Sequence, residues 1–146
     1  MKLAVGSDFA FRLLIYVATY PERLVTVREV AEAYGLSQHH LSKISKLLIK
    51  HGLLEAQRGR GGGVRLAKEP EKIRLGDVLN VCEPAPSVID CKNGVSGPCV
   101  ILPVCALRGV FGEARLAFYE VMNRYTLHDI AVKKGLRKAL AKVFES

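Results

Sequence analysis

The sequence has no tryptophan, only two methionines and no apolar run long enough to cross a membrane. The apolar residues that follow Lys2 are interrupted by Gly6, Ser7 and Asp8, so they do not form the continuous core of a secretory signal. We therefore expect a cytoplasmic protein. In that compartment, clustered cysteines are metal ligands more often than they are disulfides.

The motifs of several functional classes are also missing. No Gly-Lys-Ser/Thr follows the glycine-rich stretch at residues 57–63, which excludes a phosphate-binding P-loop. No Cys-x2-Cys pair is present, which excludes the common zinc ribbon. No Ser, His and Asp set indicates nucleophilic catalysis. We therefore expect that the chain is not an enzyme.

The charged residues of this 146-residue chain, whose net charge is +8, are unevenly distributed. Residues 1–68 carry 11 Lys and Arg against 5 Asp and Glu, and residues 133–146 carry 5 against 1. Residues 69–132 between them carry 6 against 8. A basic N-terminal half indicates a polyanion partner such as nucleic acid, with a solvated basic surface as the alternative.

The first helix is predicted over residues 7–20. Its apolar side chains Phe11, Leu14, Ile15 and Ala18 recur at helical spacing and are expected to face a core, and Ser7 is the expected N-cap. Asp8 lies in the first turn, four residues before Arg12. From these residues alone, Asp8 is expected to interact with the helix dipole and to pair with Arg12.

A helix-turn-helix follows. Thr26 is the expected cap of VREVAEAYG, Gly35 ends it, and Ser37 is the expected cap of QHHLSKISKLLIKHG, which ends at Gly52. Polar residues at the start of the second helix suit base edges and phosphates in the major groove. The predicted DNA contacts of this unit are Arg28, Ser37, Gln38, His39, His40, Ser42, Lys43 and Lys46.

A β-hairpin is predicted over residues 53–67, with QRGRGGG at its tip. Arg58 and Arg60 can reach a phosphate or a minor groove, and Gly61 and Gly62 permit a close approach of the backbone. A basic hairpin after a helix-turn-helix makes a winged helix. The sequence therefore predicts a DNA-binding domain over residues 1–82.

Three of the four cysteines lie in the stretch CKNGVSGPCVILPVC, at Cys91, Cys99 and Cys105. Its glycines and prolines exclude a helix or a central strand. Three thiolates on one loop suit a zinc or iron–sulfur centre with one further ligand, and three unrelated reduced cysteines are the alternative. Cys82 lies on the apolar side of a helix predicted over residues 75–82, so we expect a buried structural thiol. The predicted ligand loop spans residues 83–103.

The longest helix is predicted over residues 104–125, and the third unit over residues 104–146. The helix has a seam of apolar side chains at alternating spacings of four and three residues, which indicates an interface with a second chain. Packing within the same chain is the alternative. The seam residues are Leu107, Phe111, Ala114, Phe118, Val121 and Tyr125. Thr126 is expected to cap a short helix with His128 on its surface, followed by a frayed or weakly helical basic tail.

The whole pattern is mainly α with a small β wing: a winged helix-turn-helix, a cysteine-rich loop and a long dimerisation helix. To about residue 133, the chain resembles the IscR–NsrR–RirA group of winged-helix iron–sulfur repressors. The resemblance rests on SDFAFRLLIY, LSKISKLL, RGRGGGVRL, IRLGDV and the three-cysteine loop. It implies a homodimer on operator DNA, with crossing long helices. It also implies a cluster held by Cys91, Cys99 and Cys105, with [4Fe-4S] favoured over [2Fe-2S].

The resemblance changes the interpretation of Asp8. In the nitric-oxide-sensing members of the group, an aspartate near the start of the first helix is a cluster ligand donated by the partner subunit, and Asp8 occupies the matching place. This implies a repressor of nitrosative-stress genes with nitric oxide as its signal. A regulator that senses iron or iron–sulfur supply is the alternative, because the iron-sensing members share the cysteine spacing.

Overall fold

The computed structural model describes residues 3–83, 99–131 and 135–141. The described residues are mainly helical with one two-stranded sheet, as the sequence predicts, and none of their helices could span a membrane. The first half contains the helices α1 (Val5–Thr19), α2 (Val27–Tyr34) and α3 (Gln38–Lys50), the strands β1 (Leu54–Gln57) and β2 (Gly63–Leu66), the turn η1 (Pro70–Lys72) and the helix α4 (Leu75–Cys82). The second half contains the turn η2 (Leu102–Val104) and the helices α5 (Ala106–Asn123), α6 (Leu127–Ala131) and α7 (Leu136–Ala141).

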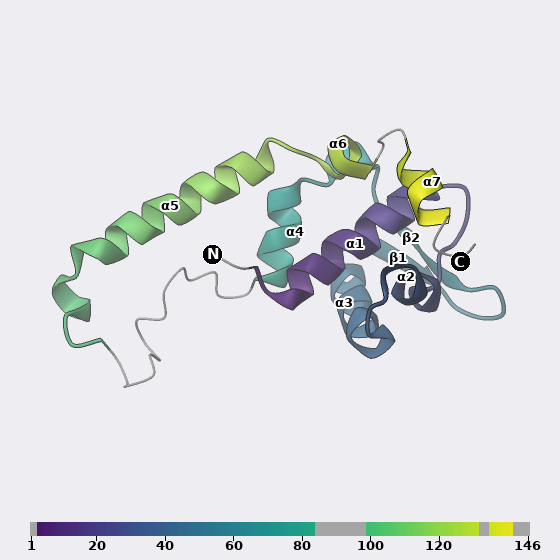
Figure 1. The fold of residues 1–146 in the computed structure, drawn as a ribbon, viewed down its shortest axis with the longest axis horizontal. Coiled ribbons are helices and arrows are strands. Elements are labelled where there is room, and N and C mark those ends of the chain that lie inside the picture. Colours follow the sequence, from purple (N-terminus) through teal and green to yellow (C-terminus); the bar gives the residue numbers. More distant parts are fainter. Residues whose placement is uncertain (1–2, 84–98, 132–134, 142–146) are drawn as a thin grey trace.

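Helix α1 forms the centre of the domain (Figure 1). It packs against α2, α3, α4, α6 and β2, and Leu13 and Leu14 on it are fully buried. Of the side chains expected to face the core, Leu14 and Ala18 are buried, and Phe11 and Ile15 pack partly exposed against it. Leu13 and Val17, which the prediction did not include, are buried as well, so the predicted apolar stripe covers only one side of the buried face.

The prediction that Ser7 caps α1 was wrong. The helix begins at Val5, and Ser7 is buried in its first turn with its hydroxyl donating to Glu83 Oε1 at 2.6 Å. The backbone N–H of Ala4 donates to the same oxygen at 2.8 Å. A carboxylate that follows α4 therefore satisfies the start of α1, where unpaired N–H groups and the helix dipole favour negative charge.

The predicted caps of the helix-turn-helix are confirmed. The Thr26 hydroxyl accepts a hydrogen bond from the N–H of Glu29 at 3.1 Å, and the Ser37 hydroxyl accepts one from the N–H of His40 at 3.4 Å. Gly35 ends α2 with φ of 61°, a conformation that favours glycine. Helix α3 ends at Lys50, two residues before its predicted end.

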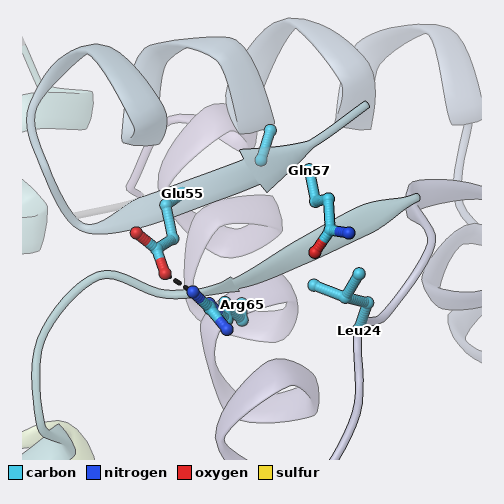
Figure 2. Close-up of a pocket in the computed structure, with 5 residues that line it drawn as sticks. Leu24, Glu55, Gln57 and Arg65 are labelled. Atoms are coloured by element: carbon cyan, nitrogen blue, oxygen red, sulfur yellow. Dashed lines mark hydrogen bonds and ion pairs between the residues drawn. The ribbon is translucent and has the colours of Figure 1, made fainter. Parts of the chain in front are cut away.

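The predicted hairpin is the antiparallel pair β1 and β2, whose register runs from Leu54 opposite Leu66 to Gln57 opposite Gly63. Val25 joins the sheet through two backbone hydrogen bonds with Val64, of 3.0 and 2.8 Å. On the sheet surface, Glu55 pairs with Arg65 beside a hollow also lined by Leu24, Ala56 and Gln57 (Figure 2). The winged-helix fold is therefore confirmed.

Helix α4 and the buried Cys82 match the prediction, and burial raises the pKa of the Cys82 thiol to about 11. Helix α5 differs from it. The structure has a 3-10 turn at Leu102–Val104, with Pro103 in it, and α5 begins only at Ala106 and ends at Asn123. It projects away from the domain (Figure 1), and none of its residues is buried.

The C-terminal elements pack back on the domain. Thr126 donates its N–H and its hydroxyl to the Asp129 carboxylate, at 2.7 and 2.8 Å, so the threonine is a donor at the start of α6 and not the expected acceptor. His128 is a surface residue, as predicted, and its Nδ1 lies 2.7 Å from the Glu71 carboxylate. The basic tail contains α7, which buries Leu140.

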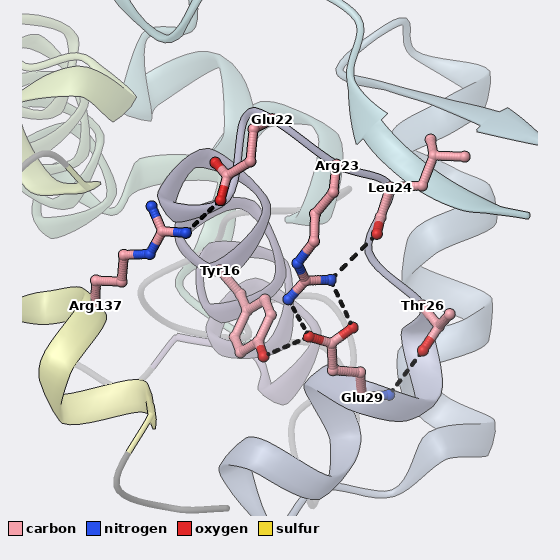
Figure 3. A network of polar contacts seen from close by, with 7 residues as sticks. All are labelled: Tyr16, Glu22, Arg23, Leu24, Thr26, Glu29 and Arg137. Atoms are coloured by element: carbon pink, nitrogen blue, oxygen red, sulfur yellow. Dashed lines mark hydrogen bonds and ion pairs between the residues drawn. The ribbon is translucent and has the colours of Figure 1, made fainter. Parts of the chain in front are cut away.

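A polar network joins α1 to α2 (Figure 3). The Tyr16 hydroxyl donates to Glu29 Oε1 at 2.8 Å, and Arg23 donates to both oxygens of the same carboxylate. The Arg23 bond is the main cause of a lowered pKa of Glu29, and the Tyr16 bond adds to it. Because Tyr16 is almost completely buried, this carboxylate fixes the start of α2 against the central helix.

The Glu29→Gln protein is expected to lose about 1.5–3 kcal/mol of unfolding free energy at neutral pH, because charge-assisted bonds become neutral ones. The native pKa lies below the usual value of about 4.3, so the wild-type stabilisation is full above that pH and is lost as the pH falls through the lowered pKa. Urea denaturation from pH 7 to pH 3, at one protein concentration, measures the difference.

The matched control is Glu32→Gln on the same helix. Glu32 pairs with Arg28, and both side chains are largely exposed, so this pair is expected to contribute much less than the Glu29 network. Equal losses for the two variants at neutral pH would show that the Glu29 network does not stabilise the domain.

Candidate nucleic-acid interface and metal ligands

One face of α3 is exposed and carries donors. Leu41, Ser45 and Leu48 are buried and set the orientation of the helix. The opposite face presents the predicted residues Gln38, His39, His40, Lys43 and Lys46, with Ser42 half-buried. Ser37 is also exposed, although its hydroxyl is the helix cap.

Lys50 is a further exposed lysine on α3 that the sequence reasoning missed. It lies four residues after Lys46, which itself follows Lys43 by three, so the three lysines form one row along the helix. Helical spacing alone was the signal that could have found it. Such a row suits a phosphate backbone.

The first turn of α1 lies directly against α3. A Cβ placed on Gly6 would lie 3.2 Å from Cδ1 of Ile44, and the rings of Phe9 and His40 are 6.5 Å apart. Asp8 lies between Gly6 and Phe9 in sequence. A change at Asp8 therefore occurs within one helical turn of contacts with the exposed helix.

The hairpin tip is exposed at Arg58 and Arg60. Gly61, with φ of 80°, has the backbone that favours glycine. A Cβ on Gly62 would overlap the carbonyl oxygen of Gln57 and lie 2.9 Å from that of Gly59, so only glycine fits this tight tip. The two arginines project from a compact turn.

Two further arginines near these elements are paired with carboxylates. Arg28, predicted as a DNA contact, is exposed on α2, and its Nε donates to Glu32 at 2.8 Å. Arg65 pairs with Glu55 beside the hollow in Figure 2. Since the carboxylate and guanidinium there satisfy each other, we assign no ligand to the hollow.

The predicted metal ligands are only partly within the described residues. Cys91 lies outside them. Cys99 is exposed and Cys105 is half-buried, they lie on either side of η2, and both are free thiols. In the described ranges, no three His, Cys, Asp or Glu side chains converge on a metal-sized site. Accessible thiols suit a soft metal centre, whereas the buried Cys82 thiol, with its raised pKa, does not.

Asp8 is half-exposed and pairs with Arg12, whose Nε lies 3.0 Å from Asp8 Oδ1, as the i,i+4 spacing predicts. Cys105 immediately precedes α5. The start of α5 is the end that points away from the domain, far from the start of α1 (Figure 1). One chain therefore does not bring Asp8 and Cys105 together.

Similarity to known sequences spans nearly the whole chain. The profile of the Rrf2 family, described as iron-dependent transcriptional regulators, matches residues 3–133. The chain is 39% identical to the HTH-type transcriptional regulator NsrR of Shouchella clausii over 141 residues, which cover 96% of this chain and 95% of that protein. It is also 39% identical to the regulator of the same name from Bacillus subtilis, over 92% of each chain.

Solved structures agree with the sequence similarity. CymR (YrzC), the global cysteine regulator of B. subtilis, superposes with a TM-score of 0.71 at 26% identity, covering 90% of this chain and 96% of that one. IscR of T. potens gives the same score and identity, covering 89% and 85%. The NsrR relatives are named as transcriptional regulators and not as enzymes, as the sequence predicts. The chain belongs to the Rrf2 family of transcriptional regulators.

Proposed function

We infer that the chain is a homodimeric DNA-binding repressor that carries an iron–sulfur cluster and responds to nitric oxide. The observation that carries this inference is the packing of the first turn of α1, which holds Asp8, against α3. A ligand change at Asp8 would be transmitted directly to the helix proposed to enter the major groove. The similar regulators are named NsrR, which is the name of the nitric-oxide-sensing members of the group that the sequence resembles.

DNA binding is supported by three exposed elements. The start of α3 offers Gln38 and His39 for base edges, and the row from Lys43 to Lys50 offers charge for phosphates. The hairpin tip adds Arg58 and Arg60, with Gly61 and Gly62 allowing the backbone to approach the DNA.

Lys43→Ala and Arg60→Ala are expected to weaken binding to any DNA sequence and to reduce the slope of affinity against salt by about one each. Gln38→Ala and His39→Ala should instead change sequence preference, at about 1–3 kcal/mol per lost base contact. Fluorescence anisotropy over a salt series measures both effects. The lysine control is Lys72→Ala, on η1 outside the proposed interface. Unchanged binding in all four variants would rule out this interface.

A dimer is supported by the apolar surface of α5. Five apolar side chains on this helix and just after it are each at least 45% exposed: Leu107, Val110, Leu116, Val121 and Tyr125. A soluble monomer rarely exposes so much apolar surface on one element. A second copy of the chain that packs along the side of α5 with Leu107, Val110, Val121 and Tyr125 would bury these four side chains, whereas Leu116 lies on the opposite side.

Cluster binding is supported by the donor set. We propose that Cys91, Cys99 and Cys105 hold a cluster, of the [4Fe-4S] type in preference to [2Fe-2S]. When bound, the cluster would supply iron that reacts with a small diatomic molecule. A carboxylate is a harder and weaker ligand for such iron than a thiolate, so Asp8 would leave the most exchangeable position.

Changing Cys91, Cys99 or Cys105 to Ala should abolish cluster binding, because each removes one of the three thiolates. Cys82→Ala is the matched control and should retain the cluster, since its thiol is buried. Iron and acid-labile sulfide assays on anaerobically purified proteins measure the outcome. Loss of the cluster from a folded Cys82→Ala protein would contradict the ligand assignment.

Ligation across the dimer is supported by the separation of Asp8 from Cys105 within one chain. Asp8→Ala should still assemble a cluster, with an altered spectrum, because three thiolates remain. A mixed dimer tests the crossing, with Asp8→Ala in one subunit and Cys99→Ala in the other. Crossed ligation predicts one complete site and one site without either residue. A mixed dimer with no wild-type-like cluster spectrum would exclude the crossed bond.

Iron supply is the second candidate signal, favoured by the description of the family as iron-dependent. Anaerobically purified protein would be titrated with nitric oxide and, separately, with an iron chelator, while DNA affinity is followed. A nitric oxide sensor loses affinity at a few equivalents of nitric oxide and resists the chelator. The reverse order of sensitivity would favour an iron sensor.

A further inference from the structure

The end of α5 packs on the start of α4 through one glycine. The amide of Asn123, the last residue of α5, lies against Gly76 in the first turn of α4. A Cβ placed on Gly76 would overlap Asn123 Oδ1 and lie 2.5 Å from its Cγ and 2.9 Å from its Nδ2. A larger residue fits at position 76 only if the Asn123 side chain, or the end of α5 that carries it, moves.

Hydrogen bonds to backbone carbonyl oxygens fix the same junction. Arg74 Nη1 donates to the carbonyl oxygen of Asn123 at 2.7 Å, and the N–H of Leu75 donates to that of Tyr125 at 3.0 Å. The N–H of Leu127 donates to the carbonyl oxygen of Ile73 at 2.8 Å. Ile73 and Leu127 are almost completely buried, so the pairing is anchored in the core.

Stability alone does not account for asparagine at position 123. Its Oδ1 is buried and accepts no hydrogen bond within the described ranges, which is unfavourable for a polar atom. Alanine at position 123 would avoid that cost and would keep the hydrogen bonds to the backbone carbonyl oxygens of residues 123 and 125. The amide does fill the space that the missing Cβ of Gly76 leaves.

We propose that Arg74, Gly76 and Asn123 form a rigid elbow that fixes the direction of α5 and thereby sets the half-site spacing that the dimer accepts on DNA. This rests on the proposed function, in which α5 meets its copy and α3 enters the groove. The 18 residues of α5 span about 27 Å. A turn of roughly 10° at the elbow moves the far end by about 5 Å, more than the rise of about 3.4 Å per base pair.

The test uses Gly76→Ala and the double variant Gly76→Ala/Asn123→Ala. The single variant should change the direction of α5. Its affinity for operators with the wild-type spacing should therefore fall at least tenfold relative to its affinity for operators whose spacing is shifted by one or two base pairs. The double variant removes all three amide atoms that the new Cβ would meet and should restore the wild-type preference. Asn80→Ala, exposed on α4, is the control and should keep that preference.

Gel-shift assays on operators of stepped spacing measure the preference, and melting temperature at fixed protein concentration is a second readout. Alanine in place of an unconstrained helical glycine raises the melting temperature. If the elbow exists, the melting temperature should fall in Gly76→Ala and recover in the double variant. If Gly76→Ala does not fold, Arg74→Ala replaces it in the spacing assay. Arg74→Ala loses the hydrogen bond to the carbonyl oxygen of Asn123. It should therefore bind operators of several spacings with affinities within threefold of one another.

Wild-type spacing preference in a folded Gly76→Ala protein would overturn the proposal, as would a double variant as impaired as the single one. Wild-type preference in Arg74→Ala would overturn it equally. Failure of the proposed function has a different signature: wild-type protein binds no DNA at any spacing. That result would remove the spacing claim, and the melting temperatures would still decide whether Gly76 and Asn123 form the contact.

Discussion

Burial of α1 is the constraint on which the rest of the structure depends. Leu13 and Leu14 are fully buried, and the helix touches α2, α3, α4, α6 and β2. One element therefore contacts the helix-turn-helix and also α4, on which the end of α5 packs. Because close-packed interiors transmit displacements and do not absorb them, a displacement of the first turn of α1 also displaces α3.

The polar contacts of α1 divide it into two ends with different partners. At its start, Ala4 and Ser7 donate to the carboxylate of Glu83, which lies eight residues before Cys91 in the sequence. Further along, Tyr16 is tied through Glu29 to the start of α2. The proposed sensing residues and the helix-turn-helix are thus attached to the same helix, one at its start and one along its length.

The sequence predicted the local features well, because their signals are local. Thr26, Gly35 and Ser37 cap and end their helices through their own chemistry, and the hairpin follows from the residues that flank its glycines. The features that the sequence missed at the two ends of the domain involve contacts between distant residues. Glu83 supplants Ser7 at the start of α1, and the fit of Asn123 on Gly76 requires two packed helices. Of the candidate site, the exposed residues of α3 were predicted, whereas the proposed cluster ligands do not converge within the described residues of one chain.

The central claim is that the cluster, through Asp8 and α1, controls the affinity of α3 for DNA. It is tested most directly by measuring the operator affinity of the wild-type protein, loaded with cluster and freed of it, anaerobically and at one salt concentration. The account predicts that loss of the cluster weakens specific binding at least tenfold, while non-specific binding, which depends on the exposed lysines, changes little. Equal operator affinity in the two states would contradict it.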